Sequence, residues 1–157
     1  MTDITNASRR DVLLGAGAAG AALLLTLRPL AASPESMDAA IRKLTGGAKI
    51  TEGRIKLDIP PLVENGNTVA MSVTVDSPMT AANHVEAIHI FNERNPQPYV
   101  MAFHLGPRAG KADISARIRL SDSQNVVAIA RMSDGTFWSH TVSVIVTLAA
   151  CLEAVSN

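Results

Sequence analysis

At residues 68–75 the sequence reads TVAMSVTV, in which the odd-numbered positions are apolar and the even-numbered positions are small or polar. The stretch DISARIRL at residues 113–120 repeats the alternation, with its even-numbered positions apolar. Because successive side chains of a strand point to opposite faces, both stretches predict strands with one buried face and one face in solvent.

Further strands are expected between turn signals rich in Gly, Pro, Asn and Asp. They cover residues 53–59, 84–92, 99–105, 125–132 and 136–148. One helix is expected at 34–47, where Ser33 can cap the first turn and Gly46-Gly47 can end the last. About seven short strands in roughly 110 residues are typical of an immunoglobulin-like sandwich. The chain is therefore predicted to be mainly β, an immunoglobulin-like β-sandwich of about seven strands with one N-terminal helix.

The N-terminus has the order of a bacterial twin-arginine (Tat) export signal. Arg9-Arg10 precedes an apolar segment at 12–27, and small residues follow at 31–33. The apolar segment is shorter than the ~20 residues that a membrane-spanning helix needs. We expect residues 1–33 to be a cleaved signal peptide, 34–148 the sandwich and 149–157 a C-terminal arm. The mature protein is then expected in the periplasm, with no membrane segment.

Charge excludes two classes of partner. The chain has 14 Lys and Arg and 14 Asp and Glu among its 157 residues. Removing residues 1–33 takes away three basic and two acidic residues, which leaves 11 and 12. A nearly neutral domain without a run of Lys or Arg lacks the basic surface that nucleic acids or anionic membranes attract.

Cys151 is the one cysteine of the chain. An exported thiol without a partner in its own chain is spare, paired with another molecule, or the working group. In the last predicted strand, the even-numbered positions from Trp138 to Leu148 are expected on the core side and Thr141, Ser143, Ile145 and Thr147 on the other. Continued to Cys151, this alternation points the sulfur away from the core. The alternative, a small buried residue in a docked tail, stays open because free Cys is commonly buried.

Several blocks together resemble SoxY, the carrier family of thiosulfate oxidation. They are LDIPPLVENGNTVAMSVTVDSPM at 57–79, the Asn-Pro-Gln-Pro turn at 95–98, SARIRLSDSQNVVAIARMSDG at 115–135 and the near-terminal Cys. The resemblance implies an immunoglobulin-like domain that pairs with a SoxZ-like β-sandwich subunit. It also implies that Cys151 holds sulfur intermediates covalently and presents them to periplasmic sulfur-oxidising enzymes of the Sox system.

The arm departs from the family pattern. The family ends in Gly-Gly-Cys-Gly, whereas this chain reads Ala149-Ala150-Cys151-Leu152-Glu153. Alanine favours helix over glycine by roughly 0.8–1 kcal/mol per residue, so this arm is expected to be stiffer. The sequence offers one nucleophile and assigns it no base or oxyanion donor, which favours a covalent carrier over an enzyme, with no catalytic residue and no cofactor.

Two other functions remain open at this point. The four histidines, His84, His89, His104 and His140, together with Cys151 equal the ligand count of the mononuclear iron site of superoxide reductases, which share the immunoglobulin-like fold. However, His84 and His89 lie an odd number of residues apart on one predicted strand, so we expect opposite faces and no metal site. The other alternative is a structural β-sandwich module in which Cys151 has no chemical role.

Overall fold

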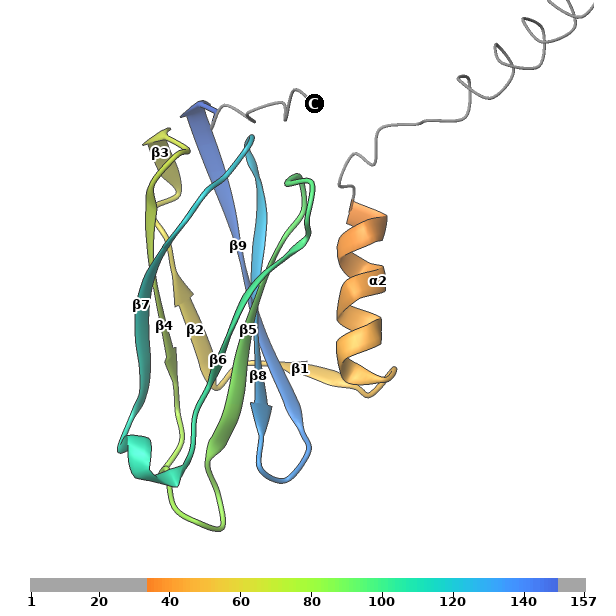
Figure 1. The fold of residues 1–157 in the computed structure, drawn as a ribbon, viewed down its shortest axis with the longest axis vertical. Coiled ribbons are helices and arrows are strands. Elements are labelled where there is room, and N and C mark those ends of the chain that lie inside the picture. Colours follow the sequence, from red (N-terminus) through yellow and green to blue (C-terminus); the bar gives the residue numbers. More distant parts are fainter. Residues whose placement is uncertain (1–33, 150–157) are drawn as a thin grey trace, which may run out of the picture. The chain divides into compact units, whose positions relative to one another are not determined.

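The computed structural model describes residues 34–149, which form nine strands and one α-helix (Figure 1). All seven predicted strands and the predicted helix are present. The elements are α2 (Pro34–Thr45), β1 (Ile50–Glu52), β2 (Ile55–Asp58), β3 (Leu62–Asn65), β4 (Val69–Val75), β5 (Val85–Asn92), β6 (Tyr99–His104), the short 3-10 helix η1 (Pro107–Ala109), β7 (Ala112–Ile118), β8 (Gln124–Met132) and β9 (Phe137–Leu148). The two short strands β1 and β3 were not predicted.

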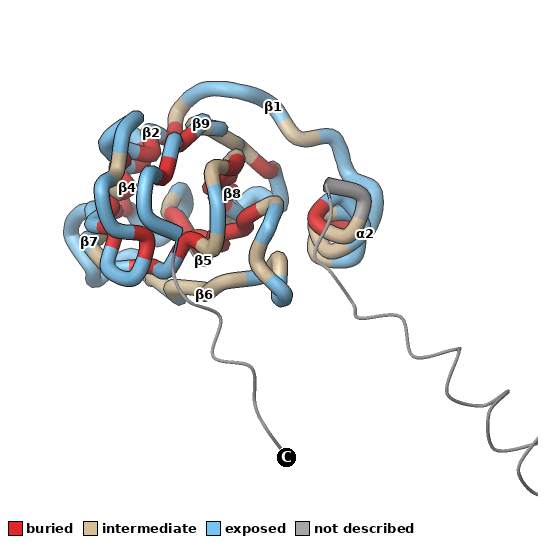
Figure 2. Tube along the Cα trace, turned by 90° about the horizontal axis from the view of Figure 1, so that it is seen from above, coloured by how far each residue is buried: buried red, intermediate tan, exposed pale blue. Residues whose placement is uncertain are grey.

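The strands form two sheets that enclose a core. The larger sheet has the order β1-β9-β8-β5-β6, with β3 pairing to β9, and the smaller has the order β2-β4-β7. Buried residues occur on the strands of both sheets (Figure 2), and most of them form one apolar core between the sheets. The largest side chains of this core that are almost completely buried include Leu57, Ile88, Ile90, Leu120 and Met132. The prediction of a β-sandwich is confirmed.

The smaller sheet has the alternation expected from its sequence. In β4, Val69, Met71, Val73 and Val75 are buried, and their antiparallel partners on β7 run from Ile118 to Ala112. The intervening positions of both strands face outward. This sheet therefore has one core face and one solvent face, as antiparallel sheets commonly do.

Helix α2 covers part of the outer face of the larger sheet. Its buried Met37 belongs to a second apolar cluster with Phe91, Val127, Ile129 and Phe137. Both faces of β5 and β8 are buried for this reason, and their sequences are apolar almost throughout. The helix ends where Gly46 and Gly47 adopt positive φ angles of 61° and 82°, a conformation that glycine adopts without steric cost.

One expectation for the last strand is wrong. Val144 and Val146 are buried as predicted, and Thr141, Ser143, Ile145 and Thr147 are exposed, but Leu148 is 63 % exposed. Pairing of β9 with β8 stops at Val144, and beyond that point β9 pairs with the edge strand β3 as far as Leu148. Leu148 therefore lies past the end of the core.

None of the helices in the described part of the chain has the length and hydropathy of a membrane span. The predicted signal peptide at 1–33 and most of the arm, 150–157, lie outside the described residues.

Candidate functional site

The predicted site residue, Cys151, also lies outside the described residues, so the structure defines the platform that leads to it. That platform is β9, a strand of 12 residues. Near its beginning β9 pairs with β1, along most of its length with β8, and near its end with β3. Strand β9 thus has strand partners on both edges at its beginning and pairs with β3 alone over its last four residues, and Ala149 follows it directly.

Hydrogen bonds to strand β3 and to two loops fix the end of β9. The Gly66 N–H donates to the Leu148 carbonyl at 2.9 Å, and the Leu120 N–H donates to the Gly66 carbonyl at 2.8 Å. The Ser123 hydroxyl accepts from the Val146 N–H at 2.9 Å, and the Thr147 hydroxyl donates to the Glu64 carbonyl at 3.2 Å. Because these bonds extend to the last residue of the strand, the arm begins at a well-anchored point.

Three of the four candidate histidines have hydrogen bonds within the sandwich. His140 on β9 accepts the Leu57 N–H at Nδ1 over 3.1 Å, which joins the two sheets. His84 lies just before β5, and its Nδ1 contacts the Thr80 carbonyl at 3.1 Å. His89 is buried on β5, with Nδ1 3.0 Å from the Tyr99 hydroxyl.

His89 and His104 come close to each other on neighbouring strands, with ring centroids 6.4 Å apart. Burial lowers the pKa of His89, and the nearby His104 and Arg131 lower it further. His89 is therefore expected to stay neutral at pH 7. Within residues 34–149, no three His, Cys, Asp or Glu side chains come close enough together to hold a metal ion.

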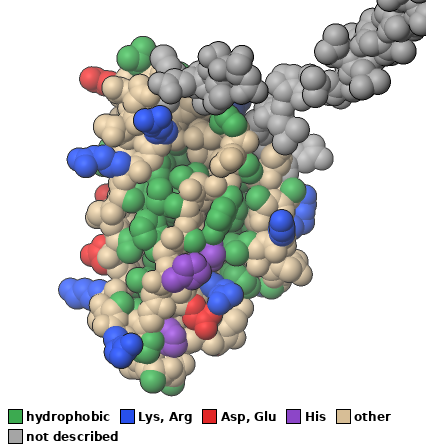
Figure 3. Space-filling view, in the orientation of Figure 1, with side chains coloured by type: hydrophobic (Ala, Val, Ile, Leu, Met, Phe, Trp, Pro, Cys, Tyr) green, Lys and Arg blue, Asp and Glu red, His purple; other side chains and the backbone are tan. Residues whose placement is uncertain are grey.

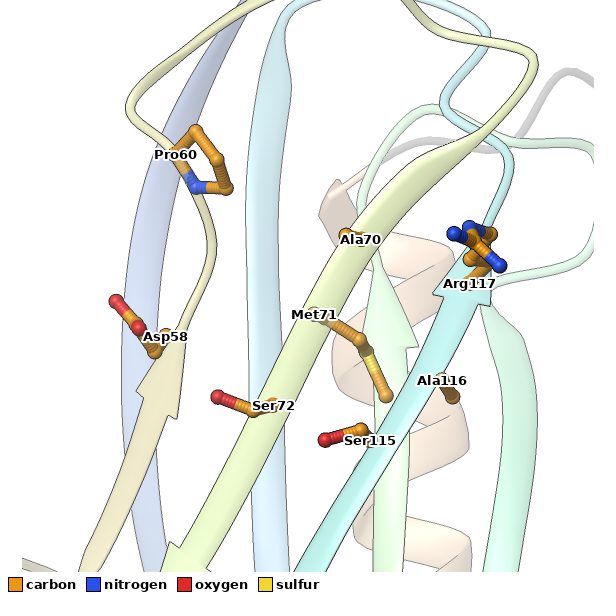
Figure 4. Close-up of a pocket in the computed structure, with 8 residues that line it drawn as sticks. All are labelled: Asp58, Pro60, Ala70, Met71, Ser72, Ser115, Ala116 and Arg117. Atoms are coloured by element: carbon orange, nitrogen blue, oxygen red, sulfur yellow. The ribbon is translucent and has the colours of Figure 1, made fainter.

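The outer face of the smaller sheet has an open hollow (Figure 4). Asp58, Ser72 and Ser115 form a row of register partners across β2, β4 and β7. The lining of the hollow contains no His or Cys. Ser72 and Ser115 were expected on the polar outer faces of their strands, and the structure places them there.

Comparison with known proteins assigns the family. The family model described as "Sulfur oxidation protein SoxY" matches residues 41–151, and the chain belongs to this family. Its fold matches the structure of the sulfur carrier protein SoxY from Chlorobium limicola f thiosulfatophilum, with a TM-score of 0.62 and 29 % identity. That match covers 74 % of this chain and 100 % of the other.

The fold is also shared with enzymes. Superoxide reductase (neelaredoxin) from Ignicoccus hospitalis matches with a TM-score of 0.54 and 18 % identity, over 60 % of this chain and 80 % of that one. At this identity the likeness shows the fold alone. No curated protein sequence matches the chain.

Proposed function

We propose that the chain is a periplasmic sulfur carrier of thiosulfate oxidation that holds sulfur intermediates covalently on Cys151 and presents them to sulfur-oxidising enzymes. The observation that carries the proposal is the family match, which spans 41–151 and ends on the one cysteine of the chain. The likeness to a solved sulfur carrier over that protein's full length supports it.

The platform suits a carrier. The end of β9 pairs with β3 on one edge, is bonded by the Ser123 hydroxyl at Val146 on the other, and is hydrogen-bonded at its last residue, so it provides a firm base for the segment that bears the thiol. Cys151 lies three residues after Leu148, and three extended residues span at most about 10 Å. The proposed site thus combines a fixed base with a short reach, so an enzyme must approach the end of β9 to reach the sulfur.

Activation of the thiol is assigned to the visiting enzyme. A free cysteine has a pKa of about 8.5, so a few per cent is thiolate at neutral pH. The charged side chain on the part of β3 that pairs with the end of β9 is Glu64, and Glu153 follows the thiol in sequence. A carboxylate that comes near a thiol disfavours the thiolate, and no Lys or Arg lies close to Cys151 in sequence, so we infer that the protein acts as substrate and carrier rather than as an enzyme.

The carrier role is tested by replacing Cys151 with serine. We expect the variant to fold normally, because the residue follows the final core strand, and to lose both the sulfur adduct and thiosulfate-dependent turnover in a reconstituted system. Mass spectrometry of the protein isolated from cells that are oxidising thiosulfate measures the adduct on the wild type. Full turnover by Cys151→Ser refutes the carrier role, and failure of that variant to fold places the thiol in the core.

A second subunit, similar to SoxZ, completes the proposal. Strands β6 and β7 are the edges of their sheets, and apolar side chains along them are half-buried: Val100, Met101, Phe103, Ile114 and Ala116. Figure 3 shows hydrophobic side chains gathered on the face that carries these strands. Such an open side suits a second β-sandwich. Co-expression with the SoxZ-like subunit is expected to give a complex that survives mild salt, and separate elution of the two chains contradicts it.

Export through the twin-arginine pathway is part of the same proposal, and it rests on Arg9-Arg10 and the apolar segment that follows. Replacing both arginines with lysine is expected to retain the protein in the cytoplasm of its host. Cell fractionation measures this, and unchanged periplasmic recovery contradicts the assignment.

A further inference from the structure

Large hydrophobic side chains are exposed where β9 ends. Leu62 is 58 % exposed, Ile145 59 % and Leu148 63 %. Tyr99 is the other large hydrophobic side chain that is exposed among residues 34–149, so three of the four lie on β3 and the end of β9. We call Leu62, Ile145 and Leu148 the arm-base patch.

The patch is local to the end of the strand. By strand alternation Leu148, three positions after Ile145, lies on the opposite face of β9, so the patch surrounds the tip of the strand. Leu62 and Ile145 are register partners of the parallel pair β3 and β9, and adjacent strands lie about 4.8 Å apart, so these two side chains are neighbours on one face. Earlier on the same face of β9, Thr141 and Ser143 are exposed and polar. Single exposed apolar residues are ordinary, but a group of them in one place indicates an interaction surface.

The length of chain between the patch and the thiol limits what can cover the patch. Cys151 follows Leu148 by three residues and Ile145 by six, distances of at most about 10 Å and 20 Å in extended chain. A standard protein interface covers about 800 Å² on each partner, which is roughly 30 Å across. A protein that encloses the Cys151 sulfur in a cleft therefore has to lie over the end of β9.

We propose that the arm-base patch is the surface on which the sulfur-processing enzymes dock, through an apolar rim around the opening of their active-site cleft. The inference rests on the proposed carrier function, and it identifies where the enzyme contacts the carrier outside the arm. Contact with these three side chains holds the carrier while the thiol is inside the cleft. Because the patch has only three side chains, it suits a weak complex between carrier and enzyme that must separate after each reaction.

The test compares aspartate substitutions on one strand. Ile145→Asp and Leu148→Asp place a charge in the patch, and Thr141→Asp is the matched control, an exposed position on the outward face of β9 about 13 Å earlier along the strand. Each full-length variant is exported and purified with its partner subunit. The kcat/KM of a sulfur-oxidising enzyme from the same host is then measured with the loaded carrier as substrate.

We expect both patch variants to lose at least tenfold in kcat/KM, while Thr141→Asp stays within twofold of wild type. Tenfold corresponds to about 1.4 kcal/mol. The rate at which iodoacetamide alkylates Cys151 is expected to be unchanged in all three variants, because a small reagent does not need the docking surface. Circular dichroism and gel filtration verify that each variant is folded and bound to its partner subunit.

Two results overturn the inference. Patch variants that are processed as fast as Thr141→Asp show that the enzymes do not use this surface, and patch variants that lose the partner subunit assign it to the subunit interface. Either result leaves the carrier function intact if Cys151→Ser still abolishes turnover. Turnover without Cys151 refutes the carrier function itself.

Discussion

Replacing Phe137 with alanine tests whether helix α2 is an integral part of the sandwich. Phe137 opens β9 and is 7 % exposed, and it belongs to the apolar cluster that joins the helix to the outer face of the larger sheet. Its buried neighbours in the cluster are Met37, Phe91, Val127 and Ile129. Removing the ring takes apolar contact away from both the helix and the sheet.

The expected cost follows from burial. Replacing a buried Phe with Ala usually lowers the free energy of unfolding by ~3–5 kcal/mol. We expect about 3 kcal/mol here, because Met37 is flexible and Leu44 half-buried, so both can move into part of the space. Against a total of about 5–15 kcal/mol for a typical domain, this loss is large, and it should lower the Tm by roughly 10 °C.

Urea unfolding of the mature protein measures the free energy of unfolding. The rate of trypsin cleavage measures how readily helix α2 opens. Arg42 and Lys43 lie exposed in α2, and cleavage there requires the helix to open. We expect cleavage of Phe137→Ala to be faster, while Thr141→Ala, an exposed position on the same strand, stays within about 0.5 kcal/mol of wild type. A loss below about 1 kcal/mol with unchanged cleavage would show that α2 contributes little to the fold.

Three further predictions concern pH, the arm and metal. Because burial lowers the pKa of His89 below its ordinary 6.5, the unfolded chain binds a proton first as pH falls, so stability should decrease from pH 7 to pH 5. In His89→Gln the urea midpoint should depend less on pH than in the wild type. Equal pH dependence in the two proteins contradicts the prediction. Replacing Ala149 and Ala150 with glycine should raise turnover if delivery is limited by the stiffness of the arm, and a reconstituted assay with equal rates argues against that limit. Elemental analysis should find no stoichiometric iron or zinc in the purified protein, and one metal per chain would favour the superoxide-reductase interpretation.

The sandwich was predictable because its long strands have a clear period. In β4 and β7 one face is buried and the other exposed, so the apolar residues alternate over seven positions in each strand. Strands β1 and β3 have three and four residues, too few for a period to be detected. Their parallel pairing with β9 joins residues more than 80 positions apart, and no local pattern records such a contact.

The sequence singles out one part of the proposed site and gives no signal for the other. Cys151 stands out because it is the one cysteine of the chain and lies in a segment that resembles a carrier family. The arm-base patch has no sequence signal, because Leu62 follows Pro60-Pro61 and Leu148 continues the apolar alternation of β9. Their exposure results from β3 extending the sheet beyond the core, a tertiary arrangement that overrides the expectation from periodicity.

The fold alone does not separate a sulfur carrier from a superoxide reductase, since this chain resembles solved structures of both. Within residues 34–149 the histidines do not gather into a group that could hold a metal ion. His140 joins the two sheets through Leu57, His84 contacts Thr80 in the preceding loop, and His89 lies on β5 beside Tyr99. Bringing these rings to one metal ion would break contacts that hold the sandwich together. A carrier needs no such rearrangement, because its chemistry requires a firm strand end, a short reach and a thiol beyond it.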